Sequence, residues 1–186
     1  MSPGRVNRQP RLEGERLRLR PLAETDREAL YVVAADPALW VLHPAHDRWQ
    51  RPVFDAMFDE ALSQGGALAV VERASGAIIG SSQFRPSARV PCAVEIGWTF
   101  LARAHWGGGA NRELKRLMLG HALGQVGRAV FRVAETNLRS RRAMEKVGAR
   151  LLDLDEDVAF PDGRTVRHVV YEIDREAFAA GPLVNP

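Results

Sequence analysis

The stretch His105-Trp106-Gly107-Gly108-Gly109-Ala110-Asn111-Arg112-Glu113 lies between an apolar pattern typical of a strand (93–101) and an amphipathic pattern typical of a helix (111–125). Three glycines at a strand-to-helix junction leave backbone N–H groups free to converge on one point, with no Cβ atoms in the way. The N-terminus of the helix adds roughly half a positive charge. This arrangement suits a phosphate or pyrophosphate, although a glycine run by itself equally fits a flexible loop.

The residues after the glycines exclude two common classes of phosphate-binding loop. A nucleoside-triphosphate loop ends in Gly-Lys-Ser/Thr, whereas Ala110-Asn111-Arg112 follows Gly109 here. A dinucleotide-binding fingerprint counted from Gly107 and Gly109 requires a third glycine at the position of Arg112. The sequence therefore predicts a phosphorylated cofactor that is bound without a metal and without the nicotinamide geometry.

A second informative segment follows a short apolar strand pattern at 130–134. Asn137 is a good N-cap for a helix over 138–147, because its side-chain oxygen can accept from an N–H two or three residues on. Gly148 is suited to end that helix in a left-handed conformation. By themselves, Asn137 is explained as a cap and Ser140 as a solvated residue of the first turn.

Taken together, the two segments resemble the Gcn5-related N-acetyltransferase (GNAT) superfamily, and within it the ribosomal-protein N-terminal acetyltransferase-like (RimJ/RimL-like) branch. The resemblance covers residues 10–178. It is carried by Glu95-Ile96-Gly97, Trp106 to Lys115, Asn137 to Ser140, Lys146 to Ala149, Leu12 to Leu22 and Pro161 to Arg164. The sequence departs from the family pattern at Ala104, in the acidic run 153–157 and at His168. These departures concern the acceptor side rather than the cofactor loop.

The resemblance implies acetyl-CoA as cofactor and acetyl transfer to an amine. The pyrophosphate would lie on the backbone amides of the loop formed by His105, Trp106, Gly107, Gly108 and Gly109. Ala110 and Asn111 at the start of the helix would also bind the cofactor. The pantetheine would run beside Phe100 and Leu101, with Asn137 and Ser140 facing it from the other side. Ser140 is the candidate proton donor to the leaving thiolate.

Glu95 is the candidate base, because a glutamate in an apolar strand has its pKa raised by burial unless it is paired. The alternative is a structural salt bridge from Glu95 to one of the arginines. The acceptor cleft is expected between the loop 40–49, including Trp40 and His43, and the hairpin 153–168. His43 and His46 lack a third ligand at a suitable spacing, so no metal site is expected.

The pattern of the chain predicts one α/β (α+β) domain with a mixed, mostly antiparallel sheet of about seven strands flanked by helices. A tail (1–10) precedes the acetyltransferase domain (11–178), and a second tail (179–186) follows it. Thr25 and Glu28 have the spacing of a capping box at the start of the first helix. The expected strands are 16–22, 67–72, 77–84, 94–101, 130–134, one from about 150, and 165–173; the expected helices are 26–34, 52–64, 111–125 and 138–147.

Composition agrees with one domain: 186 residues, 46% of them hydrophobic, support a substantial core. The single cysteine, the lack of a long apolar run and a polar start free of a signal-peptide pattern favour a cytoplasmic protein without a membrane span. The early arginines lack interleaved aromatic residues, so no nucleic-acid partner is expected. The oligomeric state stays open and is compatible with a homodimer.

Three functions remain open at this point. The first is acetylation of a protein N-terminal α-amine. Since α-amines have a pKa of about 7.7–8.0 against about 10.4 for lysine, a site with a weak base suits them better. The second is acetylation of a small amine such as an aminoglycoside or polyamine. The third is a non-catalytic, CoA-binding regulatory module.

Overall fold

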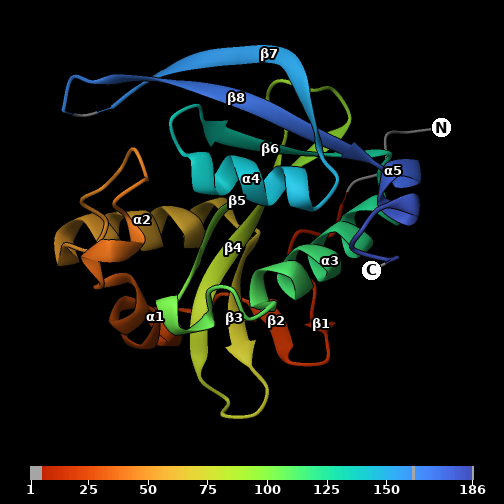
Figure 1. Cartoon of the computed structure of the whole chain (residues 1–186). Coiled ribbons are helices and arrows are strands. Elements are labelled where there is room, and N and C mark those ends of the chain that lie inside the picture. Colours follow the sequence, from red (N-terminus) through yellow and green to blue (C-terminus); the bar gives the residue numbers. More distant parts are fainter. Residues whose placement is uncertain (1–5, 161, 186) are drawn as a thin grey trace.

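A computed structural model of the chain describes residues 6–160 and 162–185 (Figure 1). One sheet of eight strands runs through it in the order β1-β2-β3-β4-β5-β6-β8-β7, and every neighbouring pair is antiparallel except β5 and β6. The strands are β1 (Leu12–Glu13), β2 (Leu17–Pro21), β3 (Ala67–Glu72), β4 (Ile78–Pro86), β5 (Ala93–Leu101), β6 (Arg128–Ala134), β7 (Arg150–Ala159) and β8 (Thr165–Asp174). The predicted fold class is confirmed, with the two-residue β1 added to the seven expected strands.

Helices cover both faces of the sheet (Figure 1). They are α1 (Arg27–Ala34), α2 (Arg51–Gln64), α3 (Ala110–Leu123), α4 (Leu138–Lys146) and α5 (Arg175–Ala180), with short 3-10 turns at Glu24–Asp26, Pro37–Leu39 and Arg103–His105. The helix α5 was not predicted. Leu183, in the stretch predicted as a tail, is buried in the core that α3 and α4 share.

The central strand β3 explains why two helical layers are needed. Leu68 and Val70 belong to the core beneath α3, whereas Ala67 and Ala69 belong to the core beneath α1 and α2. Successive strand residues point to opposite faces, so a strand that is apolar at every position must be covered on both sides. The small alanines allow α1 and α2 to approach closely.

The parallel pair β5–β6 is short, and this is the feature that shapes the site. The two strands pair only at Ala93–Arg128, Val94–Ala129 and Glu95–Val130. Beyond these positions β5 stays paired with β4, and β6 with β8. The sheet therefore opens into a fork between β5 and β6.

A β-bulge accompanies this separation. Between Gly97 and Phe100, β5 advances three residues while β4 advances only two, from Gln83 to Ser81. Trp98, inside the bulge, has a φ of 52°. A bulge bends its strand and increases the local twist, which turns the end of β5 away from its neighbour.

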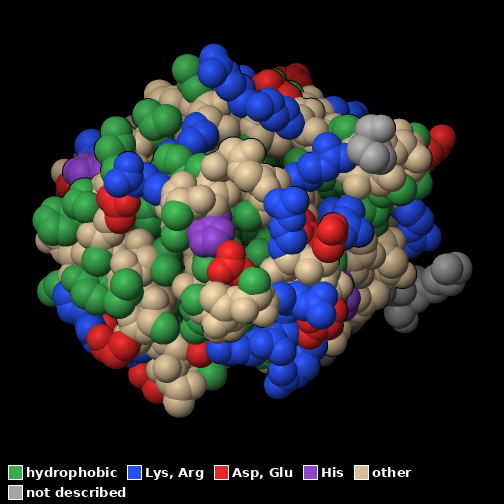
Figure 2. All heavy atoms as spheres, turned by 60° about the horizontal axis from the view of Figure 1, so that its bottom comes forward, with side chains coloured by type: hydrophobic (Ala, Val, Ile, Leu, Met, Phe, Trp, Pro, Cys, Tyr) green, Lys and Arg blue, Asp and Glu red, His purple; other side chains and the backbone are tan. Residues whose placement is uncertain are grey.

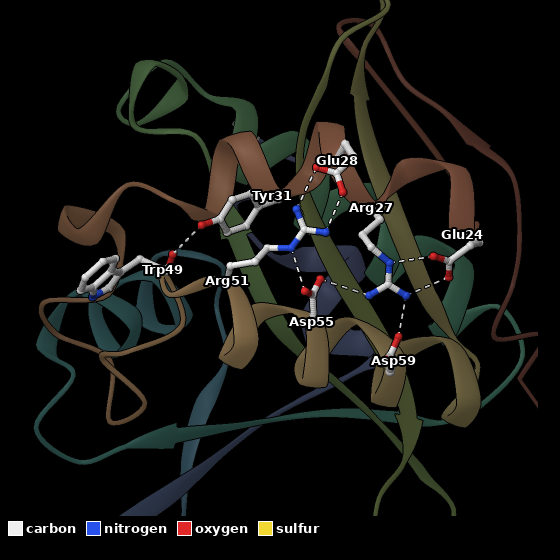
Figure 3. A network of polar contacts seen from close by, with 8 residues as sticks. All are labelled: Glu24, Arg27, Glu28, Tyr31, Trp49, Arg51, Asp55 and Asp59. Carbon is white, nitrogen blue, oxygen red and sulfur yellow. Dashed lines mark hydrogen bonds and ion pairs between the residues drawn. The ribbon is translucent and has the colours of Figure 1, made fainter.

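Helices α1 and α2 are joined by a network of ion pairs (Figure 3). Arg27 contacts Asp55 and Asp59 of α2, and Arg51 of α2 binds Glu28 of α1 with an Nη2–Oε1 distance of 2.6 Å. The predicted capping box is therefore wrong, because Glu28 is bound to the neighbouring helix. Figure 2 shows basic and acidic side chains interspersed over one face of the molecule.

The turn before α1 is held by Asp26 instead. Its carboxylate accepts from the N–H of Ala23 at 2.9 Å and forms a two-pronged ion pair with Arg20 of β2, at 2.6 and 2.7 Å. The Asp26 side chain is 6% exposed. Glu24, two residues before Asp26, is bound to Arg27, and its side chain is 65% exposed. These two acids provide a matched comparison.

Replacing Asp26 by alanine should lower the free energy of unfolding by about 3 kcal/mol, because it leaves the Arg20 guanidinium and the Ala23 N–H without partners. Glu24→Ala should cost less than about 1 kcal/mol, since its ion pair is exposed to solvent. Urea denaturation of both variants measures the difference. Equal losses for the two would show that the Asp26 pair does not anchor the turn.

Candidate functional site

A cavity of about 860 Å³ lies over the fork between β5 and β6. Its walls come from both fork strands, from the start of α3 and from α4. Among the predicted site residues, those that line it are Trp40, His43, Phe100, Leu101, Trp106, Gly107, Asn111, Asn137 and Ser140. Glu95, His105, Gly108, Gly109 and Ala110 lie outside the lining, although each is close in sequence to a lining residue.

The glycine loop presents unpaired backbone donors. Gly109 has a φ of 89° and forms the N-cap of α3, and Gly107 has a φ of 76°. Among the described residues, the N–H groups of Gly107, Gly108 and Gly109 find no hydrogen-bond acceptor. A Cβ atom added at position 107 or 108 would meet nothing within 4 Å. The loop is thus an open cradle of amides beside a helix N-terminus, which is suited to an anion.

The backbone amides of the two residues before the glycines are paired within the protein. The N–H groups of His105 and Trp106 donate to the carbonyls of Ala102 and Arg103, so they are not free for a ligand. The Trp106 indole donates to the Leu101 carbonyl at 2.9 Å and lies under the guanidinium of Arg139 at 4.2 Å. These contacts stiffen the entrance to the loop.

The cavity lining is strongly basic. In the described part of the chain its charged lining residues are Arg48, Arg112, Lys115, Arg132, Arg139, Arg142 and Lys146, with no aspartate or glutamate. A hollow bordered by guanidinium groups attracts and holds a polyanion, because arginine donates two parallel hydrogen bonds to phosphate or carboxylate. The chain as a whole has a net charge of only +3, so this basic lining is a local property of the site.

The start of α4 faces the same cavity. The Asn137 side chain accepts from the Ser140 N–H at 3.1 Å, so the predicted N-cap is confirmed. Asn137 is buried, and its cap fixes the backbone that presents the Ser140 hydroxyl to the cavity. This hydroxyl has no hydrogen-bond partner among the described residues.

Glu95 lies at the last paired position of the fork, opposite Val130. Its side chain is 12% exposed, and burial raises the pKa of its carboxyl group, opposed by the nearby Arg132. The Arg132 Nε lies 3.5 Å from Oε1 of Glu95. Both interpretations of Glu95 therefore retain support: it is paired with an arginine, and its pKa nonetheless moves toward the range of a general base.

A second cavity of about 630 Å³ adjoins the first. It is bordered by the loop before α2 and by the turn between β7 and β8, where Arg164 donates to the Pro44 carbonyl at 2.8 Å. Three residues line both cavities, namely Arg48, Trp98 and Phe100. Two molecules, one bound in each cavity, would therefore meet at this shared wall. No cluster of three metal-ligating side chains occurs in residues 6–160 and 162–185, and no helix there is long and apolar enough to cross a membrane.

Lys115 is a site residue that the sequence analysis did not identify. Its side chain is buried in the fork, where Nζ donates to the Thr99 hydroxyl at 3.1 Å and lies 5.0 Å from the centre of the Phe131 ring. Burial lowers the pKa of its ammonium group to about 7. One signal was available, because Lys115 follows Asn111 by four residues and precedes the buried Met118 by three, on the inward face of α3.

A buried lysine of this kind reduces stability, since the unfolded chain binds its proton more tightly. Lys115→Met should raise the free energy of unfolding at pH 7 by about 2–4 kcal/mol, and the gain should vanish above about pH 10.4, where lysine is neutral in both states. Lys146→Met, at the only other lysine, is the control and should change little. Urea titrations of the variants and the wild type at pH 7 and above pH 10.4 measure this gain in stability. A loss of stability in Lys115→Met at pH 7 would contradict the prediction.

Comparison with known proteins agrees with this geometry. The family model described as "Acetyltransferase (GNAT) domain" matches residues 16–150. A GCN5-related N-acetyltransferase from Brucella melitensis is 21% identical, with a TM-score of 0.80 over 97% of this chain and 85% of that one. An acetyltransferase (GNAT family) from Bacillus anthracis is 19% identical, with a TM-score of 0.70 over 90% and 99%.

A third similar structure is Mycobacterium smegmatis RimJ in complex with CoA-disulfide. It is 19% identical, with a TM-score of 0.63 over 86% of this chain and 82% of that one. The family model spans most of the chain, including the fork and the glycine loop. The chain therefore belongs to the GNAT family of acetyltransferases.

Proposed function

We propose that this acetyltransferase uses acetyl-CoA to acetylate a primary amine, and that the amine is an α-amine such as a protein N-terminus. The observation that carries the proposal is the basic cavity over the fork, which is lined at one end by Gly107, the first of three successive glycines whose amides have no acceptor. The RimJ-like branch fits the resemblance in sequence and the likeness to M. smegmatis RimJ, a protein solved with CoA-disulfide.

The residues present fit coenzyme A. Gly107 to Gly109 offer backbone donors for its pyrophosphate, and Arg112 and Arg142 supply positive charge nearby. The exposed edge of β5 at Phe100 and Leu101 would lie along the pantetheine. When bound, acetyl-CoA supplies the acetyl group as an activated thioester. Asn137 then positions Ser140, which we assign as a proton donor to the departing sulfur.

We assign Glu95 as the base that receives the proton of the acceptor amine, directly or through water. Its carboxylate lies beside Gly97, since a Cβ atom at that glycine would be 3.9 Å from Oε1, and Gly97 lines the cavity. A carboxylate paired with Arg132 is a weak base, which suits an amine that is already partly neutral near pH 7. Trp40 and His43 would contact the acceptor. The single cysteine is consistent with action in the cytoplasm.

The cofactor assignment predicts that Gly108→Asp weakens acetyl-CoA binding at least tenfold, because its carboxylate would repel the pyrophosphate. Position 108 is preferable to 109, where a φ of 89° would strain any side chain. Gly127→Asp is the matched control, at a glycine that is also open to solvent and has no positive φ. Calorimetry should show unchanged affinity in the control. Unchanged affinity in folded Gly108→Asp would rule out this placement of the pyrophosphate.

The base assignment predicts a pH-dependent defect in Glu95→Gln. With a peptide α-amine as substrate, kcat/KM of Glu95→Gln should be only slightly below the wild-type value at pH 9, where the amine is already mostly neutral. At pH 6.5 it should be clearly below the wild-type value. Because the pKa of Glu95 is raised, the wild-type enzyme should lose its base at a higher pH than an ordinary carboxylate would. A peptide whose only amine is a lysine serves for comparison.

Three results would contradict these proposals. An equal loss in Glu95→Gln at every pH would remove Glu95 from the role of base. Preference for the lysine peptide would overturn the α-amine proposal, and binding of acetyl-CoA without turnover of any amine would identify a CoA-binding module instead.

A further inference from the structure

Arg48 is an arginine without an acidic partner at the wall between the two cavities. It lies in the loop before α2 and is half-buried, and burial lowers the pKa of its guanidinium to about 10. Within the described part of the chain it forms no ion pair, although most arginines around it do. Its single polar contact is between Nη1 and Nε2 of His43, at 3.3 Å.

That contact cannot be a hydrogen bond in the neutral state of His43. The Nδ1 atom of His43 accepts from the N–H of Ala45 at 3.0 Å, so Nδ1 carries no proton. Burial and the charge of Arg48 lower the pKa of this histidine to about 3, and the ring is neutral at pH 7. A neutral imidazole with an accepting Nδ1 has its proton on Nε2. Two N–H donors therefore face each other without an acceptor.

The surroundings of these donors are aromatic and fixed. The His43 and Trp40 rings meet edge to face, with their centroids 5.7 Å apart, and the centroids of the Trp40 and Phe100 rings are 5.2 Å apart. The Arg48 guanidinium lies 5.7 Å from the centre of the Trp40 ring. An acceptor atom that contacts both N–H groups would satisfy the two donors together.

The neighbouring cations of the second cavity differ, because each already has an acid. Arg85 binds Glu60 at 3.0 Å, and Arg164 binds Asp162 at 2.6 Å. Asp47 also borders this cavity but forms no ion pair with Arg48. The unsatisfied charge at the junction is therefore the positive charge of Arg48. A polycationic amine would be repelled there, whereas an anionic group would complete the site.

We propose that Arg48 and the Nε2–H of His43 form a carboxylate-binding subsite, so that the acceptor is an amine that also carries a carboxylate group. This inference rests on the proposed acetyltransferase function and names the class of its acceptor. The carboxylate would be held by charge-assisted hydrogen bonds at the shared wall, and the amine would point toward the first cavity. An acidic side chain near a peptide N-terminus and the carboxylate of a free amino acid both offer this chemistry.

The test compares acceptors that differ only in charge: the tripeptide amides Asp-Ala-Ala and Asn-Ala-Ala, with free aspartate and spermidine as further arms. The wild-type enzyme should prefer the Asp peptide over the Asn peptide at least tenfold in kcat/KM. Arg48→Gln should reduce that preference to within threefold, because it should lower kcat/KM for the Asp peptide much more than kcat/KM for the Asn peptide. Arg116→Gln, at an exposed arginine of α3, is the control and should keep the preference. Faster turnover of free aspartate than of the peptide would identify an amino acid as the source of the carboxylate.

Binding of the two peptides by calorimetry in the presence of CoA separates this proposal from the proposed function. If no amine is acetylated but the Asp peptide binds at least tenfold more tightly, the subsite stands and the enzymatic proposal fails. Equal binding and turnover of the two peptides by the wild-type protein would overturn the subsite, whether or not Arg48→Gln folds. It would also be overturned by a preference for spermidine, or by an equal loss for both peptides in Arg48→Gln.

Discussion

The early end of pairing between β5 and β6 is the constraint on which the rest of the molecule depends. Three residue pairs hold the strands together, and beyond Glu95 and Val130 each continues with a different partner. Backbone N–H and C=O groups at a separating pair of strands lose their mutual hydrogen bonds and become available to a ligand. The bulge at Trp98 maintains this opening, and α3 and α4 border it. The cavity, the glycine cradle and Lys115 all lie around the same fork.

Arginines serve two distinct purposes in this chain, and their partners distinguish them. Arg27 and Arg51 are bound to acids and join α1 to α2 (Figure 3). Arg20 of β2 is bound to Asp26 in the turn before α1. The cavity lining contains no carboxylate, and of its arginines only Arg132 forms ion pairs among the described residues, with Glu95 and Glu156. A paired arginine contributes to the fold at little electrostatic cost, whereas a half-buried arginine without an acid, such as Arg48, is retained at the expense of stability. A half-buried arginine without an acidic partner therefore indicates a binding site for a ligand.

Several unfavourable features gather at the wall of the cavity. Trp98 has a positive φ, Lys115 is buried without a carboxylate, and Arg48 faces another donor. Each is unusual in the described part of the chain: besides Trp98, Cys92 is the only residue other than glycine with a positive φ, and the other buried charges, Asp26 and Glu172, are paired with arginines. Strain and unpaired polar groups persist where the surrounding structure enforces them, and they are typical of functional sites.

Features encoded by local sterics could be predicted from the sequence. The glycine run before α3, the Asn137 cap and the apolar strands depend on residues within one turn or one pleat, so their signals lie close together in the chain. Features that depend on distant partners could not. Glu28 has the spacing of a capping box but binds Arg51, and the pKa of Lys115 is lowered only because α3 buries its side chain against Thr99 and Phe131. Sequence alone therefore determined the fold and the position of the glycine loop, while the tertiary structure decided which charges are paired, buried or left open to a ligand, because desolvation and ion pairing depend on what surrounds a group in space.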